Sequence, residues 1–349
     1  AANIPTADAV DPAQTDDNFP QKLFSPLLYT GTGSTNALTG LGFQPDLTWI
    51  KERGGANDHK LTDSTRGVTK SLESNTTAGE ATDSNGLTAF GSDGFTVGSD
   101  AVYNNSSDTY VAWNWRANGG TTSTNSSGSI SVTQQVDPSG GFSISTYSGT
   151  DGTPTIGHGL SSAPTFVIVK QTNGTHNWAV YAKGAAATKY GFLESTSGFG
   201  TDNMWGNTTP SSTLVYLGAY TQTHGSGRNY VAYCFADTEG YIKSGSYEGN
   251  GNVDGAFIYT GFKPAFILIK GIDADGTGWN LHDNATSPFN VASTALQANT
   301  ASAELSNYNI DMLSNGFKIR DADGDLGTNG NTYIYLAFAK NPFKYATAR

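Results

Sequence analysis

The chain has 349 residues, which is long enough for two or three hydrophobic cores of ordinary domain size. Charged residues make up only 14% of it, whereas 43 glycines and abundant Ser, Thr and Asn supply material for turns. The formal net charge of −11 argues against nucleic acid and anionic membranes as partners, because both are bound through clustered Lys and Arg. With 11% aromatic residues and recurring β-branched runs, the composition favours an all-β protein over a disordered chain.

Residues 1–23 are predicted to form an extended arm outside any core. This segment is polar and acidic, contains Pro5, Pro12 and Pro20, and has no basic stretch followed by an apolar run, so it does not resemble a secretory signal. We expect the arm to become ordered only against a partner. The longest apolar runs, such as residues 265–269, are too short to span a bilayer, so no membrane insertion is expected.

The most informative feature of the chain is a unit that occurs three times. A strand-like segment with proline at its start and lysine six residues later lies at residues 45–51, 164–170 and 264–270. A tyrosine precedes each proline by 16 or 17 residues, and a closing strand-like segment begins 65 to 69 residues after it. The tyrosines are Tyr29, Tyr147 and Tyr247, and the closing segments are residues 110–115, 230–235 and 333–338. These shared anchors predict three equivalent structures.

The repeat predicts three tandem β-sandwiches of jelly-roll or lectin-like type, because each copy has about 100 residues with short strands separated by turns. The copies are bounded at residues 24–117, 142–240 and 241–349. Residues 118–141 are predicted to be a flexible linker, since they begin with an uncharged run of Gly, Ser, Thr and Asn. The second and third copies should be docked, because only residues 236–240 separate their strands.

Several segments carry a family resemblance. They are residues 42–51 (GFQPDLTWIK), 63–67 (DSTRG), 92–98 (SDGFTVG), 110–115 (YVAWNW) and 338–345 (FAKNPFKY). In combination they resemble a family from tailed bacteriophages, many of them marine, whose members are described as tail-fibre or virion structural proteins. The similarity covers the chain from about residue 27 onward. It implies a place on the virion surface after assembly in the host cytoplasm, and it supplies no catalytic residues.

We therefore expect a non-enzymatic virion surface protein, either a tail or head fibre or a decoration protein, with roles in particle structure and host adhesion. The expected partners are other virion proteins bound through the arm, further copies of the chain, with a trimer as one option, and a host-surface glycan. The sequence has no serine-hydrolase elbow, zinc-protease, Walker or dinucleotide-binding motif, so an enzyme is not expected. The alternatives are a free extracellular lectin-like protein and a polysaccharide depolymerase, which needs two carboxylates in one cleft.

Three tryptophans are candidates for glycan binding. Trp178 and Trp279 lie eight and nine residues after the repeat lysine, where the first copy has His59. A tryptophan at this position can stack on a sugar ring, or it can pack in the core of its own copy. Trp205 lies in a polar turn without a counterpart in the other copies, and such a loop aromatic is a stronger candidate for ligand binding.

One loop is a candidate calcium site, and no other cofactor is expected. Asp321, Asp323 and Asp325 offer closely spaced carboxylate oxygens, which are the ligands that calcium prefers. The loop departs from the EF-hand pattern, because Thr332 stands where the glutamate eleven residues after the first aspartate is needed. The alternative is a solvated hairpin turn. Cys234, the one cysteine, lies in a strand-like run and is expected to be a buried, unreactive thiol.

Overall fold

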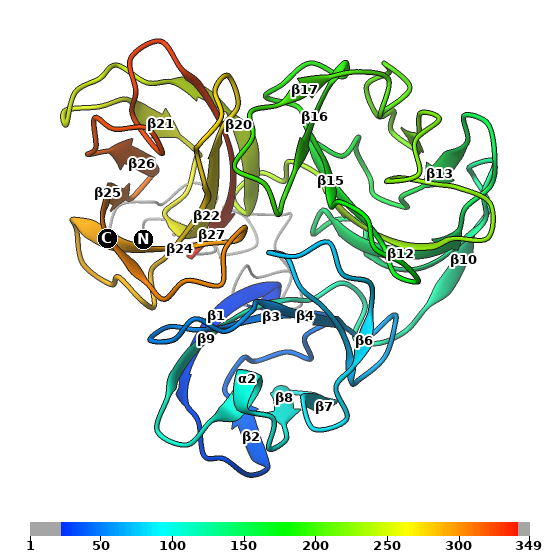
Figure 1. Cartoon of the computed structure of the whole chain (residues 1–349), viewed down its shortest axis with the longest axis horizontal. Helices are drawn as coiled ribbons and strands as arrows, with labels where there is room; N and C mark the ends of the chain where they lie inside the picture. Colours follow the sequence, from blue (N-terminus) through cyan, green and yellow to red (C-terminus); the bar gives the residue numbers. More distant parts are fainter. Residues whose placement is uncertain (1–21, 341–349) are drawn as a thin grey trace, which may run out of the picture.

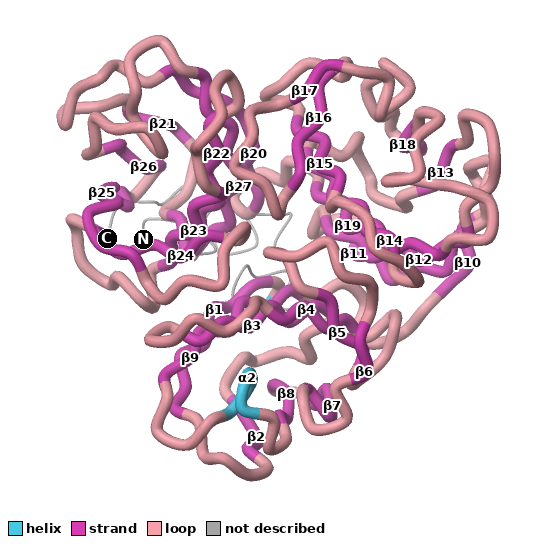
Figure 2. The backbone as a smooth tube through the Cα atoms, in the orientation of Figure 1, coloured by secondary structure: helices cyan, strands magenta, loops and turns pink. Residues whose placement is uncertain are grey.

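The computed structural model describes residues 22–340. This part of the chain consists of antiparallel β-sheets, with one short helix, α2 (Ala101–Asn104), drawn in cyan in Figure 2. The strands gather into three groups that surround a common centre (Figure 1). We call these groups the first unit (residues 22–117), the second unit (118–240) and the third unit (241–340). The expected all-β class is confirmed.

The first unit contains a large sheet and a small sheet. Its strands are β1 (Phe24–Thr30), β2 (Asn36–Thr39), β3 (Leu47–Glu52), β4 (Lys60–Asp63), β5 (Lys70–Leu72), β6 (Ala81–Thr82), β7 (Leu87–Gly91), β8 (Gly94–Val97) and β9 (Thr109–Trp115). The large sheet has the order β1-β9-β3-β4-β5-β6, and the small sheet has the order β2-β8-β7. Apolar side chains from both sheets, such as Ile50 and Phe95, form one buried cluster between them.

The second unit repeats this arrangement with two additional strands in its large sheet and one strand fewer in its small sheet. Its strands are β10 (Ser123–Asn125), β11 (Val132–Asp137), β12 (Phe142–Ser148), β13 (Thr155–Gly157), β14 (Phe166–Gln171), β15 (Ala179–Ala182), β16 (Lys189–Phe192), β17 (Gly200–Thr201), β18 (Leu214–Tyr216) and β19 (Asn229–Phe235). The large sheet has the order β10-β11-β12-β19-β14-β15-β16-β17, and β13 pairs with β18 in the small sheet. The additional strands β10 and β11 therefore lie at the edge beyond β12.

In the third unit, the large and small sheets are continuous. Its strands are β20 (Ile242–Glu248), β21 (Phe257–Tyr259), β22 (Pro264–Gly271), β23 (Trp279–Asp283), β24 (Ala292–Gln297), β25 (Leu305–Leu313), β26 (Gly316–Ile319) and β27 (Thr332–Ala339). They form one sheet in the order β20-β27-β22-β23-β24-β25-β26-β21. The pairing of β24 with β25 joins the large-sheet strands to β26 and β21, whose counterparts belong to a separate small sheet in the other units.

The strand registers agree with the sequence repeat. Each repeat tyrosine is paired with the first tyrosine of its closing strand, and the two rings stack with centroids 5.0, 5.3 and 5.1 Å apart in the three units. The pairs are Tyr29 with Tyr110, Tyr147 with Tyr230, and Tyr247 with Tyr333. The repeat prolines Pro45, Pro164 and Pro264 lie at or just before the start of β3, β14 and β22. The anchors found in the sequence therefore occupy equivalent structural positions.

The three large sheets share a core at the centre of the molecule. The Phe338 ring lies 5.1 Å from that of Phe24 and 5.5 Å from that of Phe235, so one ring from each unit meets there. These residues belong to a single buried cluster that includes side chains from all three units. Each large sheet is thus covered on one face by its own unit and on the other by its neighbours. The units form one packed body.

Residues 118–141 differ from the predicted flexible linker. Strand β11 pairs with β12, and β10 pairs with β11. Before these strands, the backbone N–H groups of Gly119 and Gly120 donate to the buried carboxylate of Asp46 at 2.8 and 2.7 Å. The composition of these residues is typical of a linker, but strand pairing and the Asp46 carboxylate hold them in place. Both interactions use backbone groups, so they are compatible with small polar side chains.

The predicted arm lies mostly outside the described residues. Of its C-terminal end, Leu23 is buried with 2% of its surface exposed, and its carbonyl accepts a hydrogen bond from Arg116 N at 2.9 Å. The first unit therefore begins earlier than residue 24. Within residues 22–340 there is no helix with the length and apolar character needed to cross a membrane.

Candidate ligand-binding pocket

Trp178 and Trp279 join neighbouring units, and the prediction that they are sugar platforms is wrong. Both are fully buried. The Trp178 Nε1–H donates to the carbonyls of Glu73 and Thr76 in the first unit, at 2.9 and 3.1 Å. The Trp279 Nε1–H donates to the carbonyl of Phe192 in the second unit at 2.9 Å. The shared position is therefore a contact between units, which differs from both alternatives that the sequence left open.

His59 has the same role in the first unit. Its Nδ1 accepts a hydrogen bond from Trp49 Nε1 at 2.9 Å, so the ring hydrogen is on Nε2, which donates to the carbonyl of Gln297 in the third unit at 3.0 Å. Burial lowers the pKa of His59 to about 3, with a further contribution from the charge of Lys51. His59 joins the first unit to the third, Trp178 joins the second to the first, and Trp279 joins the third to the second. The three contacts thus close a ring.

Two of the three repeat lysines also serve these contacts, whereas Lys51 binds the carbonyls of Glu52 and Gly55 in its own unit. Lys170 Nζ donates to Thr77 O of the first unit at 3.2 Å, and Lys270 Nζ donates to Thr196 O of the second unit at 3.1 Å. Both side chains are fully buried, and burial lowers each pKa to about 8. The ammonium groups therefore remain charged at neutral pH and bind backbone carbonyls. Their role is to hold loops of adjacent units together.

Trp205 is a core residue of the second unit, so the prediction that it binds ligand from an open loop is also wrong. Only 1% of its surface is exposed, and its ring packs edge-on against that of Tyr181 with centroids 6.0 Å apart. Among residues 22–340, its Nε1–H has no hydrogen-bond partner. The polar neighbours of Trp205 in the sequence form the turn, while the indole points inward.

Asp321, Asp323 and Asp325 do not form the predicted calcium site. The Asp325 carboxylate accepts hydrogen bonds from Gly278 N at 2.6 Å and Tyr308 OH at 3.0 Å, whereas Asp323 is exposed to solvent. In the described part of the chain, no group of three or more His, Cys, Asp and Glu side chains is placed to hold a metal ion. The carboxylates diverge because one of them is used to fix the loop.

Cys234 is a buried thiol, as expected. It lies in β19 with no exposed surface, and burial raises its pKa to about 12. The thiolate needed for nucleophilic chemistry is therefore not formed near neutral pH.

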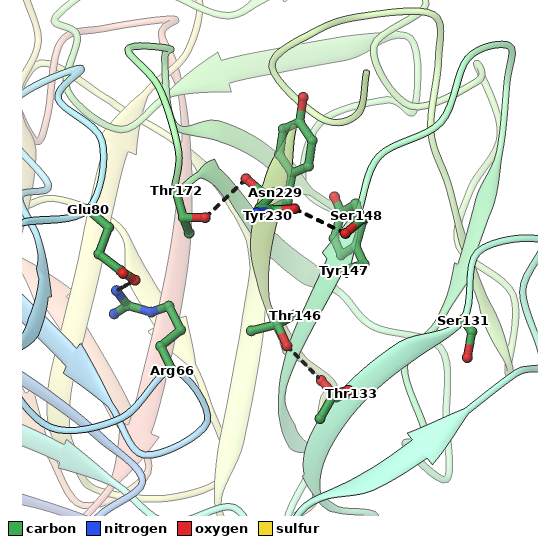
Figure 3. Close-up of a pocket in the computed structure, with 10 residues that line it drawn as sticks. All are labelled: Arg66, Glu80, Ser131, Thr133, Thr146, Tyr147, Ser148, Thr172, Asn229 and Tyr230. Carbon is green, nitrogen blue, oxygen red and sulfur yellow. Dashed lines mark hydrogen bonds and ion pairs between the residues drawn. The ribbon is translucent and has the colours of Figure 1, made fainter. Parts of the chain in front are cut away.

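A pocket of about 460 Å³ lies where the first and second units meet (Figure 3). The first unit contributes Arg66 and Glu80. The second unit contributes hydroxyl, amide and tyrosine side chains, namely Ser131, Thr133, Thr146, Tyr147, Ser148, Thr172, Asn229 and Tyr230. Sequence reasoning missed this site, although Ser131 with Thr133 and Thr146 with Ser148 each place two hydroxyl groups on one strand face.

Arg66, the cation that lines the pocket, is already paired with carboxylates of its own unit. Arg66 donates to Asp63 Oδ2 at 2.5 Å and to Glu80 Oε2 at 3.0 Å. Lys70 Nζ lies 3.9 Å from the second carboxylate oxygen of Glu80, Oε1. The guanidinium group is nearly buried, with 4% of its side chain exposed. The first-unit wall is therefore polar and fixed by ion pairs, and its one lining cation is paired with two carboxylates.

The second-unit wall is equally well fixed. The stacked Tyr147 and Tyr230 rings belong to the core of the second unit, on the sheet face opposite to Thr146 and Asn229, and their hydroxyls donate to the carbonyls of Thr223 and Thr221 at 2.6 and 2.8 Å. At the rim, Ser148 Oγ donates to Asn229 Oδ1 at 3.0 Å. Within the described residues, the Asn229 Nδ2 hydrogens have no partner, and the exposed hydroxyl oxygens keep the capacity to accept. The pocket thus offers preorganised polar groups to a ligand.

Comparison with known proteins identifies a family without a described activity. No curated protein matches the chain. The family model described as "Domain of unknown function (DUF7483)" matches residues 19–342. Because this match covers nearly the whole sequence, the chain belongs to the DUF7483 family.

Proposed function

We propose that the chain is a non-enzymatic surface protein of a tailed-bacteriophage particle, serving particle structure and host adhesion as a tail or head fibre or a decoration protein. The resemblance of segments such as residues 42–51 and 110–115 to virion proteins is the first support. We also interpret each unit as a β-sandwich of jelly-roll type, because large-sheet and small-sheet side chains pack in one cluster.

The observation that carries the proposal is how the chemically versatile side chains are used. His59, Trp178, Trp279 and the buried lysines Lys170 and Lys270 all bind backbone carbonyls of an adjacent unit. A ring of such contacts around one core makes the three units rigid relative to one another. Rigidity of this kind suits a part that bears load on a particle.

The two ends of the described chain favour attachment from one side. Phe24 and Phe338, which lie close to Lys22 and Lys340 in the sequence, meet at one end of the large sheets. The pocket is at the other end of the second unit, where Ser148 pairs with Asn229, while Phe142 and Phe235 pair at the end near the centre. We propose that residues 1–21 bind other virion proteins, that copies of the chain associate, with a trimer as one option, and that the pocket faces outward.

A free extracellular lectin-like protein is the second candidate, and the polar pocket is the feature that favours it. A depolymerase has less support. Glycoside hydrolysis needs two carboxylates in one cleft, and Glu80 is the single carboxylate among the residues that line this pocket, where it is paired with Arg66.

Immunogold labelling tests the proposal. Antibodies raised against the purified full-length protein are applied to intact particles of the phage that encodes it, with particles of an unrelated phage as the control. We expect gold at fixed positions on the particle surface. Unlabelled particles, combined with antigen in the culture medium, would favour the free lectin-like protein instead.

A further inference from the structure

We propose that the pocket between the first and second units binds a neutral saccharide. This inference rests on the adhesive function proposed above and assigns that function to a site and a ligand class. The volume of about 460 Å³ lies within the range of about 300–1,000 Å³ that is usual for small-molecule sites. The tryptophans expected to bind a glycan are buried, so this pocket takes their place.

Charge indicates a neutral ligand. A sulfated, phosphorylated or sialylated sugar needs an unpaired cation, usually an arginine that can bind two oxygens. Arg66 already donates to Asp63 and Glu80, and Lys70 approaches Glu80. An anionic ligand would have to displace a carboxylate from Arg66 or lie beside it. The net charge of −11 opposes anions over the whole surface as well.

Hydrogen-bonding capacity indicates a polyhydroxylated ligand. Serine and threonine hydroxyls both donate and accept, as sugar hydroxyls do, and Asn229 adds two amide hydrogens at the rim. Thr133 and Asn229 are exposed, so their polar groups can reach a ligand without a change in fold. Thr133 and Asn229 stand on strands that both pair with β12, and this fixed backbone limits the entropy lost when a ligand binds.

Within the described residues, the pocket depends on a feature that the second unit has and the other two do not. Strand β11, which follows Ser131 and contains Thr133, extends the large sheet of the second unit beyond β12. The strands equivalent to β12 in the other units are β1 and β20, and within residues 22–340 each of them is an edge strand with no further strand beside it. The segment that departs from the repeat therefore builds one wall of the pocket, as expected if it was added for binding.

The experiment measures saccharide binding to the full-length protein by saturation-transfer-difference NMR and isothermal titration calorimetry. The neutral probes are maltotriose and triacetylchitotriose, and the anionic comparator is sialyllactose. Thr133→Trp fills the pocket from an exposed position, and Asn229→Ala removes the rim amide. Thr109→Ala is the matched control, because Thr109 occupies in β9 the register position that Asn229 occupies in β19. Thermal unfolding verifies that each variant is folded.

We expect at least one neutral probe to bind and sialyllactose to bind more weakly. Thr133→Trp should abolish binding, Asn229→Ala should weaken it about three- to tenfold, as the loss of one hydrogen bond does, and Thr109→Ala should leave it unchanged. Binding that Thr133→Trp does not reduce would overturn the site while leaving the adhesive function intact. Tighter binding of sialyllactose, or no binding of either neutral probe, would overturn the ligand class. Absence of the protein from particles would instead contradict the proposed function.

Discussion

Replacement of Trp178 by phenylalanine tests whether the contacts between units stabilise the fold. The change keeps an aromatic ring but removes the Nε1–H that donates to the carbonyls of Glu73 and Thr76. Trp205→Phe is the matched control, because Trp205 is also fully buried but its Nε1–H has no partner in the described chain. Loss of ring volume should cost about 1 kcal/mol in either variant. Trp178→Phe also removes the donor to the partly buried Thr76 carbonyl, whereas Glu73 O keeps the hydrogen bond from Thr76 N at 3.3 Å, and this loss costs about 1–3 kcal/mol more.

The difference is measured by urea denaturation followed by circular dichroism, with the slope and the midpoint compared among wild type and both variants. We expect the free energy of unfolding of Trp178→Phe to lie about 1–3 kcal/mol below that of Trp205→Phe. Removal of an unpaired buried donor can even make Trp205→Phe nearly neutral. Equal losses in the two variants would refute the conclusion that hydrogen bonds between units contribute to stability.

Three further predictions concern the central core, the buried His59 and the N-terminal arm. Phe235→Ala should cost about 3–5 kcal/mol, because the ring stacks on Phe142 at 4.8 Å and meets Phe338 in the central core; an unchanged urea midpoint would contradict this. Burial lowers the pKa of His59 to about 3, so between about pH 6.5 and 3 the unfolded chain binds a proton that the folded chain does not. The stability that His59 contributes is therefore lost as pH falls from about 6.5 toward 3. Its NMR ring signals should not shift between about pH 8 and 5. Deletion of residues 1–21 should leave thermal unfolding cooperative and abolish co-sedimentation with particles, whereas retained co-sedimentation would place attachment elsewhere.

The repeat and the strands could be predicted from the sequence because their signals are local. Proline and lysine six residues apart mark β3, β14 and β22, and a continuous apolar run such as residues 166–169 is typical of a strand covered on both faces. What covers the second face is not a local property. It is the neighbouring unit, which meets Phe166 and the equivalent residues across sequence separations of about 100 residues. The identity of that partner could not be read from any one segment.

The predictions that failed are those that depend on where a side chain points and which group it binds. The polar neighbours of Trp205 suggested an exposed loop, yet the indole points into the core. Asp325 fixes its own loop and so cannot join Asp321 and Asp323 around a cation. The composition of residues 118–141 suggested a linker, although Asp46 and an edge-strand pairing hold them in place. The carboxylate contacts of Asp46 with Gly119 and of Asp325 with Gly278 join residues that are distant in sequence.

Quantitative mass spectrometry of gradient-purified particles tests the proposed function most directly. Particles and culture medium are collected from one infected culture, and the amount of this chain is compared with that of the major capsid protein in both fractions. We expect the chain to co-purify with particles at a constant ratio to the capsid protein through successive gradients. A chain found in the medium and absent from purified particles would contradict a virion surface protein.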